Sequence, residues 1–141
     1  MTDPYRYGTP PPSMIAQSDD KTMPIVVYAL FLAGYFTGGL SPIVGVIVAY
    51  VSKGSAQPLS ASHFDFQIRT FWLSIAGGVL ATVLFFMGAI MVHASPVFAL
   101  FSVIGCLVML VQTVWFIIRC IVGLVRVMQD QPSPDPRSLL I

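Results

Sequence analysis

Long apolar stretches alternate with short polar segments along most of this chain. Residues 22–52 carry no charged side chain, and residues 71–118 form a second uncharged stretch. A helix needs about 20 mostly apolar residues to cross a bilayer core about 30 Å thick. The pattern therefore predicts an all-α integral membrane protein of three to four helices, made of a transmembrane helical hairpin and a broken first hydrophobic segment.

The hairpin is predicted over residues 63–93 and 97–128. The two segments are joined by the turn His93-Ala94-Ser95-Pro96. Proline suits the first turn of a helix because its missing N–H has no partner there, so Pro96 starts the second helix with Ser95 as its N-cap. The segment before the hairpin, 53–62, is polar and is expected to be a loop.

The depths of four residues support this hairpin. Trp72 and Trp115 lie at similar distances from the turn, and Arg69 and Arg119 lie a few residues further away. Tryptophans gather at membrane interfaces, with basic residues just outside them. Because this match follows from the turn position alone, it places the membrane boundary near residue 70 on one helix and residue 118 on the other.

The first hydrophobic segment is broken near its centre. Gly38 and Gly39 end a helix, and Ser41-Pro42 starts another, which predicts helices over 22–37 and 42–53. The pair either forms one kinked span or folds back as a re-entrant hairpin. Folding back places all seven Lys and Arg residues on one side, so the positive-inside rule favours it. In either arrangement residues 53–70 and the C-terminus are expected to be cytoplasmic.

Composition supports a membrane class and excludes others. The chain is 56% hydrophobic and 9% charged, against about 25% charged in ordinary soluble domains. A net charge of +1 gives no field that attracts nucleic acid. We expect a disordered polar tail at 1–21, a transmembrane domain at 22–128 and a disordered proline-containing tail at 129–141. The expected location is the bacterial inner membrane, with the lipid bilayer as the first partner.

A polar segment at the start of the hairpin is the main candidate site. His63, Gln67 and Thr70 share one helical face, and Asp65 and Arg69 are spaced as an i, i+4 pair. The face either points into the helix bundle or a partner, or it forms an interfacial lead-in that meets headgroups and water. The interfacial interpretation is favoured.

Arg119 and Arg126 extend this candidate interaction cluster on the second hairpin helix. They are seven residues apart, share a face and lie near anionic headgroups at the predicted depth. The hairpin count places Arg119 at the interface, where it can snorkel to water. The sharpest functional hypothesis is a polar contact across the hairpin, from Arg119 to Asp65 or Gln67.

The chain offers little catalytic chemistry. It contains no Glu, no glycine-rich phosphate loop and no zinc-protease motif, so no catalytic residue, metal or cofactor is expected. Cys106 and Cys120 are about 21 Å apart along one helix, too far for a disulfide. The predicted function is a non-catalytic membrane protein that packs against partner membrane proteins or itself. The alternative is a small transporter, channel or translocon-type component, suggested by the break at Gly38, Gly39 and Pro42.

The chain also resembles a known family over about residues 22–128. The most specific element is the run His63-Phe64-x-x-Gln67-Ile68-Arg69-Thr70-Phe71-Trp72, together with the glycine-containing first segment. This run is similar to that of small bacterial membrane proteins of unknown function that are distantly Tic20-like. The resemblance implies three to four transmembrane helices and a loop leading into the helix that carries His63 and Gln67. It implies no known activity.

Overall fold

The apolar segments fold as helices. A computed structural model describes residues 20–134, and all regular structure in that range is helical. The helices are α1 (Thr22–Ala33), α2 (Leu40–Lys53), α3 (Pro58–Met91), the short 3-10 helix η2 (Pro96–Phe98) and α4 (Ala99–Met128). The all-α fold class predicted from the sequence is confirmed for these residues. The predicted tails at 1–19 and 135–141 lie outside them.

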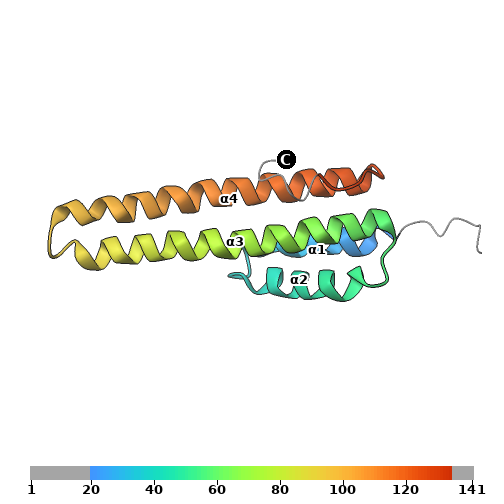
Figure 1. Cartoon of the computed structure of the whole chain (residues 1–141), viewed down its shortest axis with the longest axis horizontal. Coiled ribbons are helices and arrows are strands. Elements are labelled where there is room, and N and C mark those ends of the chain that lie inside the picture. The colour runs from blue at the N-terminus through green and yellow to red at the C-terminus, as the bar shows by residue number, and fades with distance from the viewer. Residues whose placement is uncertain (1–19, 135–141) are drawn as a thin grey trace, which may run out of the picture.

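Two long helices form the frame of the molecule. α3 and α4 run antiparallel along its whole length, and the short α1 and α2 lie side by side against one half of them (Figure 1). α3 and the segment Pro96–Met128 are each long and apolar enough to cross a membrane. The molecule is therefore four helices thick at one end and two helices thick at the other.

The first hydrophobic segment folds back on itself. Gly38 and Gly39 have φ values of 62° and 92°, which favour glycine, and they reverse the chain between α1 and α2. The Ser41 hydroxyl donates a hydrogen bond of 2.8 Å to the Leu30 carbonyl and fixes the turn. The break predicted at Gly38, Gly39 and Pro42 is confirmed, and the chain adopts the fold-back alternative. α1 ends earlier than predicted, at Ala33.

Two predicted boundaries are corrected. The expected loop at 53–62 is shorter, because Pro58 already occupies the first position of α3 and fits there without losing a hydrogen bond. Ser95 is extended and makes no side-chain capping bond, so it is not an N-cap of the predicted kind. Pro96 instead starts η2, which leads into α4.

The hydrophobic core lies in the four-helix half. Phe31 of α1 contacts Phe71 of α3 and Phe116 of α4, with ring centroids 6.2 and 5.8 Å apart. Such tilted aromatic pairs contribute about 0.5–1.5 kcal/mol each beyond the area they bury. The core therefore fixes α1 and α2 against the long hairpin.

The other half of the hairpin holds together by close backbone approach. A Cβ added at Gly105 of α4 would lie 2.7 Å from the Phe85 backbone nitrogen of α3. The Ser102 hydroxyl donates a hydrogen bond of 2.9 Å to the Phe85 carbonyl. Small residues at such contacts are typical of helix packing in membranes. This half buries little side-chain surface and leaves its outer faces apolar.

Candidate functional site

The polar face of α3 points into the bundle. His63 and Gln67 are 0% exposed and Thr70 is 2% exposed, although the segment begins near the end of the molecule. The shared face predicted for these residues is therefore present. Their burial agrees with the bundle-facing interpretation and disagrees with the favoured interfacial one. The physical reason is that α1 folds back over this face and covers it.

His63 connects three parts of the chain. Its Nε2 lies 2.9 Å from the Gln131 backbone carbonyl, and its Nδ1 lies 3.2 Å from the Tyr28 hydroxyl of α1. Because a carbonyl can only accept, Nε2 carries the proton. In the neutral tautomer Nδ1 then accepts from Tyr28. The imidazole thus bridges α1 to the segment that follows α4.

Gln67 and Ser60 attach the start of α1 to α3. The Gln67 amide nitrogen donates a bond of 2.9 Å to the Pro24 carbonyl, and Ser60 donates one of 3.3 Å to the Asp20 carbonyl. Hydrogen bonds from the Thr22 side chain and backbone N–H hold the pKa of the exposed Asp20 carboxyl below its usual value. Both hydrogen bonds are structural links between α3 and the start of the first helical segment.

Arg119 lies inside this cluster. It is 1% exposed, its Nε donates a bond of 2.9 Å to the Thr70 hydroxyl, and Thr70 donates one of 2.7 Å to the Phe66 carbonyl. The guanidinium carbon lies 4.2 Å from the Phe66 ring centroid and 5.0 Å from that of Trp115. The hairpin depth predicted that Arg119 snorkels at an outer surface. This prediction is wrong, because the side chain is buried. The two aromatic rings and α3 enclose it.

The remaining predicted site residues lie outside the buried cluster. Asp65 forms an ion pair with Lys53 of α2, not the predicted i, i+4 pair, and Arg69 is exposed. Arg126 is half-buried in the last turn of α4, where a cation complements the helix dipole. The hydrogen bond across the hairpin is thus present, but it joins Arg119 to Thr70.

The buried cluster also includes residues that the sequence did not single out. Tyr28 comes from an apolar stretch, and Gln131 contributes only its backbone carbonyl. Ser133 donates from its backbone N–H to the Ser62 hydroxyl at 3.1 Å. No periodicity points to contacts that join residues so far apart in the chain. Among these additional residues, only Thr70 could be found from the sequence, because it shares the predicted face with His63 and Gln67.

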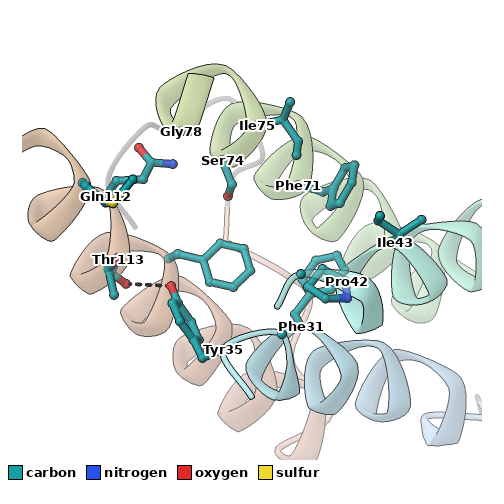
Figure 2. Close-up of a pocket in the computed structure, with 14 residues that line it drawn as sticks. Phe31, Tyr35, Pro42, Ile43, Phe71, Ser74, Ile75, Gly78, Gln112 and Thr113 are labelled. Carbon is teal, nitrogen blue, oxygen red and sulfur yellow. Dashed lines mark hydrogen bonds between the residues drawn. The ribbon is translucent and has the colours of Figure 1, made fainter. Parts of the chain in front are cut away.

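A cavity of about 380 Å³ lies beside the tip of the α1–α2 pair, between α3 and α4 (Figure 2). We call it the tip cavity. Its lining is mostly apolar and aromatic: Phe31, Gly34, Tyr35, Gly39, Pro42, Ile43, Phe71, Ser74, Ile75, Gly78, Met109, Gln112, Thr113 and Phe116. Binding pockets for small molecules commonly have this size and composition.

Gln112 is the unusual member of this lining. Its side-chain nitrogen is buried and has no hydrogen-bond partner. Its amide packs against Gly77 of α3, where an added Cβ would collide with it. In Figure 2 the Gln112 amide and the Ser74 side chain point into the cavity from α4 and α3. The amide nitrogen is therefore an unpaired donor that protein atoms cover at the wall of a mostly apolar space.

Comparison with protein-family models, with curated proteins and with solved structures finds no match to this chain. Within residues 20–134, no three His, Cys, Asp or Glu side chains gather closely enough to hold a metal ion. Two features of the structure therefore remain as functional candidates: the buried polar cluster and the apolar surface with its tip cavity.

Proposed function

We propose that this chain is a non-catalytic, multi-pass inner-membrane protein that works by packing its long hairpin against partner membrane proteins or a second copy. The observation that carries the proposal is the exposure of α3 and α4. Only 11% and 6% of their most apolar stretches are buried. Exposure of this surface to water would be unfavourable, since each Å² of apolar area in contact with water costs about 25 cal/mol of free energy.

The exposed residues run along both long helices from the level of the tip of the α1–α2 pair towards the opposite turn. They include Leu80, Val83, Phe86, Ile90, Val103, Leu107, Leu110 and Val111. Monomeric soluble proteins rarely carry a continuous apolar patch above a few hundred Å². A lipid bilayer or neighbouring helices would cover this surface, which supports membrane insertion of the two-helix half.

Charge supports one orientation. Lys21, Lys53, Arg69 and Arg126 all lie at the four-helix end, whereas residues 92–98, at the opposite turn, carry no charge. Short loops rich in Lys and Arg stay on the cytoplasmic side. We therefore place the loop between α2 and α3 in the cytoplasm and the four-helix end in the cytoplasmic leaflet, with α1 and α2 as a re-entrant pair.

The buried polar cluster supports a structural role. Its hydrogen bonds join α1 to α3, α3 to α4, and α3 to the segment after α4. Buried, mutually bonded polar groups hold helices in one arrangement. The cluster thus makes the four-helix half a rigid base for the exposed hairpin, which suits a protein that presents a surface.

Cysteine labelling tests the topology. In a background with Cys106→Ala and Cys120→Ala, single cysteines replace Thr22, Ser55 or His93 and are treated with a membrane-impermeant maleimide. We expect the Thr22 and Ser55 variants to react only in inverted vesicles and the His93 variant only in intact spheroplasts. Labelling of the Thr22 and Ser55 variants from opposite sides would contradict the re-entrant pair.

Photo-crosslinking tests the packing role. A photoreactive residue at Val103, which is 54% exposed, is compared with one at Phe64, which is 1% exposed. Ultraviolet light should join Val103 to another membrane protein or a second copy in native membranes, and Phe64 should give no such adduct. Recovery of the Val103 variant without any protein adduct would contradict the proposal.

A second function is favoured by one observation. The helix break at Gly38 and Gly39 lies beside the tip cavity, and interrupted helices often line substrate paths in transporters. This supports a small transporter, channel or translocon-type component. Solute or ion flux into liposomes above the level of protein-free liposomes would support a transporter or channel, and background flux would exclude both.

A further inference from the structure

We propose that residues 135–141 bind in a groove between α3 and α4, so that the chain covers part of its own apolar surface. The groove has a volume of about 370 Å³ and is lined by Leu73, Val108, Val111, Gln112 and Trp115. We call it the lateral groove. A partner that packs on this side of the hairpin would first have to displace the segment, which goes beyond the proposed packing role.

The path of the chain after α4 points to this occupant. The Ser133 backbone N–H donates to the Ser62 hydroxyl at 3.1 Å, and the Ser133 hydroxyl donates to the Ser62 carbonyl at 2.9 Å. The His63 Nε2–H donates to the Gln131 carbonyl at 2.9 Å, and Pro134 is buried. The last described residues therefore lie on α3, and residue 135 continues from the surface of that helix.

The attachment point and the lateral groove share one side of the α3–α4 pair. Ser62, Phe66 and Leu73 are spaced i, i+4 and i+11, so they lie on one face of α3. The Phe66 ring lies against the Arg119 guanidinium, so this face borders α4. The Trp115 ring also contacts Arg119, and it lines the groove together with Leu73.

The length of the segment matches the distance to the groove. Leu73 lies eleven residues beyond Ser62, which is about 16 Å along α3 at 1.5 Å per residue. An extended chain advances about 3.3 Å per residue, so Ser138 and Leu140 can reach about 16 and 23 Å from Ser133. The groove extends from Leu73 toward the opposite turn. Residues 138–140 therefore reach it without crossing the four-helix half.

The sequence of the segment fits a groove with one apolar wall. Three large apolar residues, at 139–141, follow the charged Asp135 and Arg137. Alternate side chains of an extended chain point to the same side. Leu140 would therefore share the inward side of the buried Pro134, while Asp135 and Arg137 would point outward. This arrangement buries Leu140 against the groove and leaves both charges at the surface.

Disulfide crosslinking of the full-length chain in detergent tests the proposal. The background carries Cys106→Ala and Cys120→Ala. Leu140→Cys is combined with Leu73→Cys, which lines the groove, or with Ile75→Cys, which lies on another face of α3 and lines the tip cavity. A disulfide needs Cα atoms within about 7 Å. Mild oxidation should close the Leu73 pair within one chain, seen as a mobility shift on a non-reducing gel, and leave the Ile75 pair reduced.

The attachment to α3 provides a second measurement. Ser62→Ala with Ser133→Ala removes the side-chain bonds that hold the segment, so the Leu73–Leu140 disulfide should form more slowly. Equal crosslinking of the Leu73 and Ile75 pairs would overturn the proposal, as would a Leu73 pair that stays reduced, which would leave the groove to lipid or a partner helix. A disulfide between two chains through Leu73→Cys would assign the groove to a second copy. These outcomes are read in detergent, so they do not depend on the proposed membrane packing.

Discussion

At the scale of single residues, a buried guanidinium holds the two long helices together. Arg119 bonds Thr70 and stacks on Phe66 and Trp115. Hydrogen bonds to charged groups contribute about 1.5–3 kcal/mol, and desolvated cation–π contacts up to about 2 kcal/mol. The residue therefore acts as a structural anchor and not as a lipid ligand.

Replacement of this anchor should destabilise the protein. We expect Arg119→Ala to lower the free energy of unfolding by about 2–4 kcal/mol, because it removes both interactions at once. Thermal unfolding in detergent, followed by circular dichroism, measures the loss. The exposed Arg69→Ala is the control and should change stability by less than about 0.5 kcal/mol. Equal effects of the two substitutions would contradict the assignment.

Gly123 is a second residue whose environment allows a quantitative test. A Cβ at this position would collide with the hydroxyl and ring of Tyr28, so Gly123→Ala should cost about 1–3 kcal/mol. Gly78→Ala, which meets open space, should be neutral or stabilise the helix by about 0.5–1 kcal/mol. The same unfolding measurement compares them.

A double-mutant cycle separates the collision from other effects. With Tyr28→Leu already present, the colliding hydroxyl and ring are gone, and Gly123→Ala should cost less than about 0.5 kcal/mol. If the cost remained the same in both backgrounds, the contact between Tyr28 and Gly123 would not be the cause.

Single residues also show what the sequence could and could not predict about the site. Helical spacing was enough to place His63, Gln67 and Thr70 on one face. Spacing cannot say which element covers a face, and the fold-back of α1 decided that this one is buried. The partner of Arg119 depended on the same packing, since Asp65 turns outward to Lys53.

At the scale of elements, the reversal between α1 and α2 depends on two glycines. Their positive φ values cost about 1–2 kcal/mol for each residue with a Cβ. We expect the double substitution Gly38→Ala, Gly39→Ala to destabilise the protein by about 2–4 kcal/mol, measured as above. Gly54→Ala, at φ −64°, meets nothing within 4 Å and should be nearly neutral. A neutral double substitution would show that the reversal does not require glycine.

Elements were predicted best where local chemistry fixes them. The hairpin followed from uncharged length and from the depths of Trp72 and Trp115, and the break followed from Gly38-Gly39 and Ser41-Pro42. Helix ends were predicted less well. Pro58 could start a helix or belong to a loop, and the structure shows that it starts α3. The missing Ser95 cap shows that η2 replaces a capped helix start.

At the scale of the whole molecule, the two cysteines report on the environment of α4. Cys106 is exposed near the middle of the long hairpin, and Cys120 is buried in the core. A water-soluble maleimide does not enter hydrocarbon, and packed side chains cover Cys120. We expect neither cysteine to react with a water-soluble maleimide in sealed or inverted vesicles, and both to react in SDS. Rapid labelling of Cys106 in vesicles would place the two-helix half in water.

The unequal thickness of the molecule has a consequence for the membrane itself. α1 and α2 reach along only half of the long hairpin (Figure 1). In the proposed orientation each copy occupies the area of four helices in the cytoplasmic leaflet and of two helices in the opposite leaflet. Such a wedge fits best where the cytoplasmic leaflet lies on the convex side. Local curvature would therefore sort this protein within a membrane, with no specific partner involved.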